Sequence, residues 1–350
     1  MRETLAVKYR PKTFEDVCGQ TNQIKILENQ LKTGQHKNAY LFAGYSGCGK
    51  TTLARIFAKE LNKGKGQPIE LDAARNNSVD DIRSMIDDSS YKSMDSEYRI
   101  YILDEAHQLS ASAWSALLKV LEEPPSKTIF ILCTTDPQKI PMTILNRVQR
   151  FDFKKIDDRL IKERLNYIIR MEEERIDPEA HEKDIPIIDI SKESLDYIIK
   201  LSNGGMRDAI ALLDKCLSYS HSLDVDEVTS ALGISSYDDL IMFMKLIKDK
   251  DRKGLLDLIN SLSNNGIDLK QNLKQFYLFL VDVCKYLLTE DVEMTKIPSI
   301  YESEIKEFNY KFCLYLLEEF MIIYETLKWE DSIKELLTAK VLVLTKEEKN

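Results

Sequence analysis

The sequence predicts an α/β domain built on a parallel sheet, followed by an all-helical region. A glycine-rich loop at residues 44–51 follows an apolar run and precedes a helix-like segment. As far as about residue 155, short apolar runs alternate with amphipathic segments, which is typical of a parallel sheet covered by helices. Beyond residue 156 the strand pattern disappears, and amphipathic helical segments continue along the chain.

The individual elements follow from apolar spacing and from the residues that begin or end helices. Strands are expected at residues 38–42, 69–72, 99–103 and 128–133. Helices are expected at 21–33, 52–61, 79–89, 112–123, 157–173, 191–202, 206–219 and 224–232, and within 236–350, for example at 238–248, 269–288 and 311–328. Thr21 is the expected N-cap of the first helix. The side chains expected to face inward from the helix at 112–123 are those of Trp114, Leu117, Leu118 and Leu121. The acidic residues 177–189 are expected to form a loop.

The glycine-rich loop is expected to bind phosphate. The order of strand, loop and helix is that of a P-loop, whose backbone N–H groups surround phosphate oxygens at a helix N-terminus. Lys50 should reach the β- and γ-phosphates, and Thr51 should bind Mg²⁺. The residues expected to contact the nucleotide in this stretch are Gly44, Tyr45, Ser46, Gly47, Cys48, Gly49, Lys50, Thr51 and Thr52.

Two adjacent carboxylates supply the second part of the expected site. Asp104 and Glu105 directly follow the strand at 99–103. Asp104 is expected to hold Mg²⁺ through water, and Glu105 to orient and activate the attacking water. Thr135, at the end of the next strand, is a candidate for contact with the γ-phosphate or with that water. Together these residues predict a site that hydrolyses a nucleoside triphosphate.

Two arginines are candidates for stabilising negative charge during hydrolysis. The reaction needs positive charge at the γ-phosphate beyond that of Lys50, and an arginine finger can supply it. Arg147 follows the fourth expected strand, and Arg207 lies at the start of the helix at 206–219. Spacing alone does not show where either side chain points, and a surface salt bridge is the alternative for each.

Length and charge limit the classes of function. A chain of 350 residues is long enough for two or three domains. Residues 1–155 carry 23 basic and 19 acidic side chains, and residues 156–350 carry 26 and 39. This asymmetry argues against a protein that grips nucleic acid over its whole surface and places any DNA contact on the first part. The alternative is a solvated acidic helical surface beside a roughly neutral domain.

Several other classes are not expected. The chain has no apolar run long enough for a membrane span and no apolar signal-peptide core near its start. Its six cysteines are scattered and form no C-x-x-C pair, so neither a zinc site nor a disulfide framework is expected. We therefore expect a protein of the cytoplasm with reduced thiols.

In this order the motifs resemble those of the AAA+ clamp-loader ATPases, in particular the gamma/tau type of bacterial DNA polymerase III. The resemblance covers nearly the whole chain. It rests on residues 8–11, 14–20, 44–51, 71–77, 103–107, 116–125, 134–141 and 204–209. The segments 117–125 and 134–141 are the most specific of these.

The resemblance implies domains and residue roles. It implies a RecA-like nucleotide-binding domain at 1–155, a small helical lid at 156–222 and a helical collar at 223–350 that holds a ring of subunits together. Arg147 matches the finger inserted into the neighbour's ATP site, although Asn146 and Val148 replace the family's flanking Ser and Cys. Arg207 matches the lid arginine that senses nucleotide in its own subunit, and Thr135 matches the sensor on the sheet. The adenine is expected near Val17 and the segment containing Arg10.

The resemblance also implies a function. ATP and Mg²⁺ would drive a loader that opens a sliding clamp and places it on primer-template DNA. The implied partners are the clamp, the DNA and other clamp-loader subunits in a pentamer-like ring, with single-strand-binding protein as a further candidate. The implied location is the bacterial cytoplasm or nucleoid, or a phage-infected cell. Alternatives are another AAA+ remodeller, such as a helicase loader or a Holliday-junction motor, and a non-hydrolysing structural subunit of a clamp loader.

Surface contacts and two departures complete the expectations. Arg75, Arg83 and Lys119 are candidates for the DNA side or a subunit interface. Tyr91 and Met94 are candidates for contact with the clamp, and ordinary surface packing is their alternative. No cysteine lies between residues 61 and 72, where the family carries a zinc module, so no zinc is expected. The long tail of the tau form is also expected to be absent, which implies a compact version.

Overall fold

The computed structural model describes residues 3–89, 91, 95–177, 187–264, 268–291, 294–327 and 332–346. The chain forms two compact units. The sheet unit comprises Met1–Glu172 and Ser202–Asp214, and the helical unit comprises Glu173–Leu201 and Lys215–Asn350. The division into three domains at residues 155 and 222 stays a prediction. Among the described residues, no helix is both long enough and apolar enough to span a membrane.

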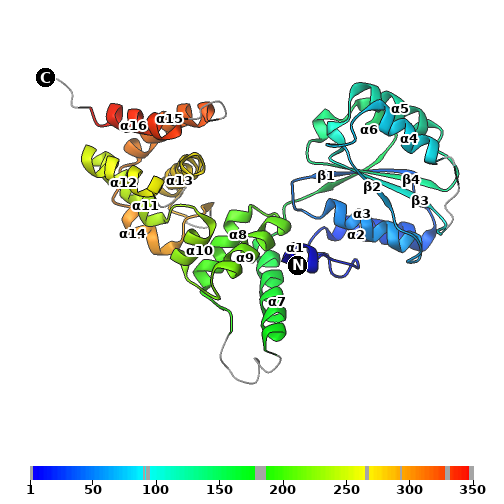
Figure 1. Cartoon of the computed structure of the whole chain (residues 1–350), viewed down its shortest axis with the longest axis horizontal. Coiled ribbons are helices and arrows are strands. Elements are labelled where there is room, and N and C mark those ends of the chain that lie inside the picture. Colours follow the sequence, from blue (N-terminus) through cyan, green and yellow to red (C-terminus); the bar gives the residue numbers. More distant parts are fainter. Residues whose placement is uncertain are drawn as a thin grey trace. The chain divides into compact units, whose positions relative to one another are not determined.

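The sheet unit is built on a five-stranded parallel sheet in the order β2-β3-β4-β1-β5 (Figure 1). Its strands are β1 (Ala39–Gly44), β2 (Ile69–Asp72), β3 (Arg99–Asp104), β4 (Thr128–Thr134) and β5 (Gln149–Phe153). The predicted parallel α/β sheet is confirmed, with all four expected strands within two residues of their predicted bounds. The fifth strand, β5, was not expected. It lies at the edge of the sheet, and only Phe151 and Phe153 of its side chains are buried.

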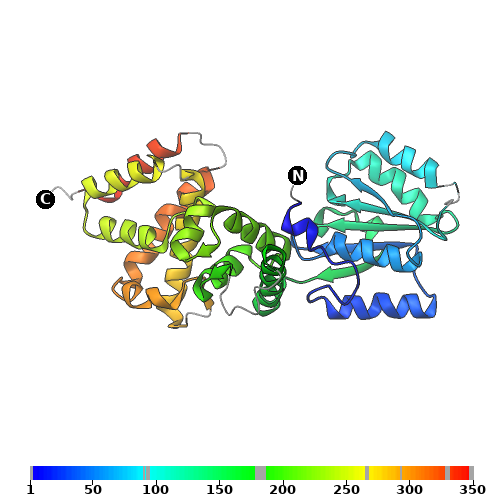
Figure 2. The same ribbon diagram turned by 60° about the horizontal axis from the view of Figure 1, so that its bottom comes forward.

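Helices cover both faces of this sheet (Figures 1 and 2). The helices α2 (Thr21–Thr33) and α3 (Lys50–Leu61) lie on one face, and α4 (Val79–Ser89), α5 (Ala111–Glu122) and α6 (Met142–Leu145) lie on the other. Because side chains alternate along a strand, Tyr40 and Phe42 of β1 join the core beneath α3, whereas Leu41 joins the core beneath α5. Each face of the sheet therefore has its own core, with side chains from several strands. Both cores hold the strands, and so their ends, in place.

The sheet unit also contains all or part of α1 (Leu5–Lys8), α7 (Asp158–Ile176) and α9 (Met206–Tyr219). The parts of α7 and α9 within the sheet unit are residues 158–172 and 206–214. Helix α1 is short, with its C-cap at Tyr9, and Pro11 two residues later cannot continue a helix.

The helical unit confirms the predicted all-helical region. Its helices are α8 (Lys192–Ser202, as far as Leu201), α10 (Val225–Leu232), α11 (Tyr237–Lys248), α12 (Arg252–Asn264), α13 (Leu269–Thr289), α14 (Glu302–Ile305), α15 (Tyr310–Thr326) and α16 (Ile333–Leu344). Phe243, Phe276 and Phe320 meet in its core, with the rings of Phe276 and Phe320 4.8 Å apart. The complete loss of strands beyond residue 156 was wrong in one detail. β6 (Asp189–Ile190) and β7 (Ser222–Leu223) form a short parallel pair.

Two local expectations need correction. The N-cap of α2 is Gln20, not Thr21, and Gln20 has a left-handed backbone with φ of 55°. Its side-chain amide donates to the carbonyl oxygens of Cys48 and Lys154, at 3.3 and 2.7 Å. These tertiary contacts override the local capping preference. On α5, Leu118 is only partly buried. Residues 178–186 of the expected loop at 177–189, Met94, and Lys328 at the end of the expected helix 311–328 lie outside the described residues.

Candidate functional site

The loop at residues 44–51 connects β1 to α3 and depends on its glycines. Gly47 and Gly49 have φ angles of 70° and 101°, where a side chain is disfavoured. Gly44 lies so close to β5 that a Cβ atom would lie 2.5 Å from the carbonyl oxygen of Phe153. A Cβ atom on Gly47 would lie 3.2 Å from the Cα atom of Gly205. The loop therefore packs tightly against two segments that are distant in sequence.

The amine of Lys50 lies inside this loop. Lys50 is the first residue of α3 and is 6% exposed. Its Nζ atom donates to the carbonyl oxygens of Gly44 and Tyr45, at 2.9 and 2.8 Å. The neighbouring Cys48 is buried, and this burial raises the pKa of its thiol, while the charge of Lys50 lowers it in part. A buried thiol that stays protonated at neutral pH serves as a packing group, so Cys48 needs no redox role.

Thr51 and Asp104 meet beside the loop. The Thr51 hydroxyl donates to Oδ2 of Asp104 at 2.9 Å. Hydroxyl, carboxylate and water oxygens are the ligands that Mg²⁺ prefers, so this pair fits a magnesium ion. Among the described residues, no group of three or more His, Cys, Asp or Glu side chains is placed to hold a metal ion. The expectation of no zinc stays a prediction.

Glu105 is held by the residues that follow β4. Its carboxylate accepts hydrogen bonds from the hydroxyl and the backbone N–H of Thr135, at 3.0 and 3.3 Å. The Nδ1 atom of His107 lies 3.4 Å from the same carboxylate oxygen and 3.2 Å from the Thr134 hydroxyl. Glu105 has a left-handed backbone, with φ of 47°, a strained conformation that is concentrated at functional sites. The structure thus brings Glu105 and Thr135 together and adds His107, which was not expected.

A cavity of about 320 Å³ adjoins these groups and lies within the sheet unit. The expected site residues that line it are Arg10, Val17, Ser46, Gly47, Cys48, Gly49, Lys50, Thr51, Thr52, Asp104, Glu105 and Arg207. The other expected residues, Gly44, Tyr45, Thr135 and Arg147, are not among its lining residues. The cavity therefore joins the phosphate loop, the acidic pair and the segment expected near adenine.

Several lining residues were missed, including direct neighbours of the expected Val17 and Arg207. They are Ala6, Cys18, Arg55, Ile156, Arg164, Met206 and Ile210. Arg164, on α7, donates from Nη2 to the carbonyl oxygen of Tyr9 at 2.8 Å. Glu172, on the same helix and 2% exposed, accepts from the amine of Lys8 and from the hydroxyl of Tyr9. Helix α7 thus holds the N-terminal segment that lines the cavity, here called the N-terminal wall (Ala6, Tyr9, Arg10 and Pro11). No local sequence signal marks these contacts.

Arg147 lies outside the cavity, in a contact with α5. Its Nη2 atom lies 2.6 Å from Oε1 of Glu122, and its Nη1 atom donates to the carbonyl oxygen of Thr143 at 2.7 Å. Among the expected DNA-side residues, Arg75 and Arg83 pair with nearby aspartates on the surface, and Lys119 is exposed. Tyr91 is also exposed. These positions leave the expected DNA and clamp contacts as predictions.

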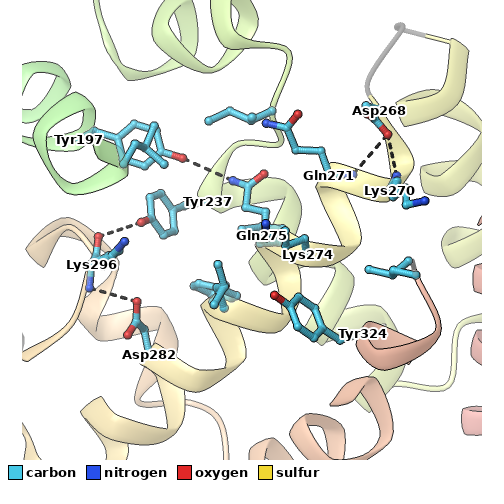
Figure 3. Close-up of a pocket in the computed structure, with 16 residues that line it drawn as sticks. Tyr197, Tyr237, Asp268, Lys270, Gln271, Lys274, Gln275, Asp282, Lys296 and Tyr324 are labelled. Atoms are coloured by element: carbon cyan, nitrogen blue, oxygen red, sulfur yellow. Dashed lines mark hydrogen bonds between the residues drawn. The ribbon is translucent and has the colours of Figure 1, made fainter. Parts of the chain in front are cut away.

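A larger cavity of about 640 Å³ lies in the helical unit (Figure 3). Several polar groups on its wall form hydrogen bonds within that unit. The Gln275 amide donates to the Tyr197 hydroxyl at 3.4 Å, and the Tyr237 hydroxyl donates to the carbonyl oxygen of Lys296 at 2.8 Å. Burial raises the pKa of both tyrosines. None of the expected site residues lines this cavity, and we assign no chemistry to it.

Comparisons with known proteins identify the relatives of this chain. Residues 19–72 and 68–157 match the family model described as DNA polymerase III, delta subunit. The DNA polymerase III subunit tau of Bacillus subtilis is 38% identical over 309 residues, which are 81% of this chain and 52% of that protein. The gamma/tau subunit of Mycoplasma genitalium is 31% identical over 91% of this chain and 55% of its own length. The gamma subunit of Buchnera aphidicola (subsp. Schizaphis graminum) is 32% identical over 79% of each chain.

The chain spans about half the length of the first two of these relatives. Among solved structures, the RuvB Holliday junction branch migration motor of Thermotoga maritima matches with a TM-score of 0.48 and 23% identity. That match covers 68% of this chain and 79% of RuvB. The sequence identity to these tau and gamma/tau proteins extends over most of the chain, 81% and 91% of it respectively. This chain therefore belongs to the gamma/tau subunit family of DNA polymerase III.

Proposed function

We propose that this chain is an ATP-hydrolysing motor subunit of a sliding-clamp loader, which opens a clamp and places it on primer-template DNA during replication. The observation that carries the proposal is the convergence of Lys50, the Thr51–Asp104 pair and Glu105 at one cavity. Membership of the gamma/tau family supports the clamp-loader role, because these relatives are named as DNA polymerase III subunits.

The phosphate end of ATP would lie in the loop at 44–51. Lys50 already places its amine among loop carbonyls, and phosphate oxygens would form stronger, charge-assisted bonds with it. Thr51 would hold Mg²⁺ directly and Asp104 would hold it through water. The bound ion would neutralise negative charge on the phosphates during transfer. Arg10, Val17 and the N-terminal wall would hold the adenine end.

Glu105 would orient the attacking water and accept its proton. The two hydrogen bonds from Thr135 keep its carboxylate at the end of β4, next to Asp104. Phosphoryl transfer depends mainly on positioning and on charge neutralisation, so a fixed carboxylate beside the metal pair is suited to this role. Thr135 would act as the sensor on the sheet through this contact.

The two arginines would act on different nucleotides. Arg207 lines the cavity of its own chain and would contact the nucleotide bound there. Arg147 is exposed and is not among the lining residues, which suits a finger that reaches the nucleotide of a neighbouring subunit. Each phosphate loop would then be completed by the next subunit, so that hydrolysis depends on correct assembly of a pentamer-like ring.

This role implies four kinds of partner: primer-template DNA, the clamp, other loader subunits and single-strand-binding protein. The loader would read the DNA backbone by charge and shape, through exposed residues such as Arg75, Arg83 and Lys119. Tyr91 is the remaining described candidate for contact with the clamp. The place of action would be the bacterial cytoplasm or nucleoid, or a phage-infected cell.

The proposal can be tested by measuring steady-state ATP hydrolysis by the assembled loader with and without primed DNA and the clamp. We expect both to stimulate hydrolysis. Glu105→Gln should lower kcat about 100-fold or more while ATP still binds, because it removes the base and keeps the side-chain shape. The matched control is Glu60→Gln, an exposed glutamate on α3, which should keep the wild-type rate.

Each alternative predicts a different result. Hydrolysis that responds to neither DNA nor clamp would refute the loader role and favour another remodeller. Stable assembly without any hydrolysis would indicate a structural subunit. A wild-type rate in Glu105→Gln would show that another residue activates the water.

A further inference from the structure

The ion pair between Arg147 and Glu122 is the starting observation. Glu122 is the last residue of α5, and Arg147 lies two residues beyond the end of α6. The Nη2 atom of Arg147 lies 2.6 Å from Oε1 of Glu122. These elements are far apart in sequence, and the pair forms outside the nucleotide cavity.

Two acceptors fix the guanidinium of Arg147. Glu122 binds Nη2, while the carbonyl oxygen of Thr143 accepts from Nη1 at 2.7 Å. The backbone N–H of Arg147 donates to the carbonyl oxygen of Ile144 at 2.8 Å, which fixes the start of the side chain. Because the group is planar and rigid, two bonds at different nitrogens set its plane and leave other N–H donors for an anion.

Stability does not explain why a carboxylate stands at position 122. The side chains of Arg147 and Glu122 are 34% and 46% exposed, and ion pairs this exposed contribute little to stability. A negative charge at a helix C-terminus is disfavoured by the helix dipole, and Glu123 follows directly. On stability alone, an uncharged residue would suit the end of α5 at least as well.

We propose that Glu122 is a positioning residue for the arginine finger. It holds the guanidinium of Arg147 in one orientation before the neighbouring subunit's ATP arrives. A long side chain without this contact would occupy several rotamers, and only some of them would present its donors to the γ-phosphate. The inference rests on the proposed function, in which Arg147 acts on the nucleotide of a neighbour.

Four variants test the inference in the complete loader with primed DNA and clamp. Glu122→Gln should lower kcat about five- to tenfold and change the KM for ATP less than about twofold, because the group acts on transfer and not on binding. Glu123→Gln, the adjacent exposed glutamate, is the matched control and should keep the wild-type kcat. Arg147→Ala should be slower than Glu122→Gln. The double variant Arg147→Ala/Glu122→Gln should be no slower than Arg147→Ala alone, because Glu122 acts only through Arg147.

The outcomes separate this inference from the proposed function. A wild-type kcat in Glu122→Gln, or further slowing by Glu122→Gln in the Arg147→Ala background, would overturn the positioning role. Full stimulated hydrolysis in Arg147→Ala would instead refute the finger assignment itself. Circular dichroism and thermal unfolding identify any folding defect. If Glu122→Gln shows one, Glu122→Ala repeats the measurement without a polar group at the site.

Discussion

Alanine at position 47 tests how tightly the phosphate loop is packed. Gly47 has φ of 70°, so any side chain there occupies the left-handed region. Its Cβ atom would also lie 3.2 Å from the Cα atom of Gly205 and 3.3 Å from Oδ2 of Asp208. These contacts are close enough that either the loop or the turn before α9 must move.

The expected loss of nucleotide affinity follows from both effects. The left-handed backbone costs an L-residue about 1–2 kcal/mol. The crowding adds about 1–3 kcal/mol, the usual range for an overpacked site. Without nucleotide the loop can relieve the crowding by shifting, and binding must restore its shape. The two costs together are about 2–5 kcal/mol, so we expect Gly47→Ala to weaken ATP binding about 30-fold or more, since 1.4 kcal/mol corresponds to about tenfold.

Titration of a fluorescent ATP analogue measures this change. The control is Gly34→Ala, because Gly34 has φ of 66° in the same unit and a Cβ atom there would meet nothing within 4 Å. Gly34→Ala has the same unfavourable left-handed backbone without the crowding, and it should leave the affinity for ATP unchanged. Binding by Gly47→Ala within about twofold of wild type would refute the reasoning, as would equal losses in both variants.

Two further predictions concern the wall of the cavity. Glu172→Gln should raise the KM for ATP about tenfold with little change in kcat, because it removes the charged acceptor that Lys8 and Tyr9 share. Steady-state kinetics would check this prediction, and an unchanged KM would contradict it. Burial raises the pKa of the Cys18 thiol, so alkylation at pH 7.5 should be slow and should accelerate as the pH rises through this raised pKa. Bound ATP should slow the alkylation of Cys18 further, which peptide mass spectrometry would measure. Rapid labelling that does not respond to ATP would contradict the prediction.

The strand ends of the candidate site could be predicted because their signals are local. Lys50 and Thr51 follow a glycine loop, and Asp104 and Glu105 end an apolar run. A parallel sheet brings such strand ends to one edge, so their convergence followed from the alternation of strands and helices.

Contacts made by the tertiary structure could not be predicted. The side chain of Gln20 binds both the loop at 44–51 and the segment after β5. For this reason Gln20, and not the expected Thr21, is the N-cap of α2. The edge strand β5 has few buried side chains, so its apolar signal is weak. The partner of Arg147 lies on a helix distant in sequence, and spacing carries no information about such a pair.

The close approach of Gly44 to Phe153 has a mechanical consequence. The backbone of the loop at 44–51 lies against the end of β5 without room for a side chain, so a shift of one toward the other would cause a clash. The chain runs from β5 directly into α7, whose Arg164 and Glu172 hold the N-terminal wall. The loop proposed to hold the phosphates and the wall proposed to hold the adenine are thus connected through β5 and α7, so a shift of one should be transmitted to the other.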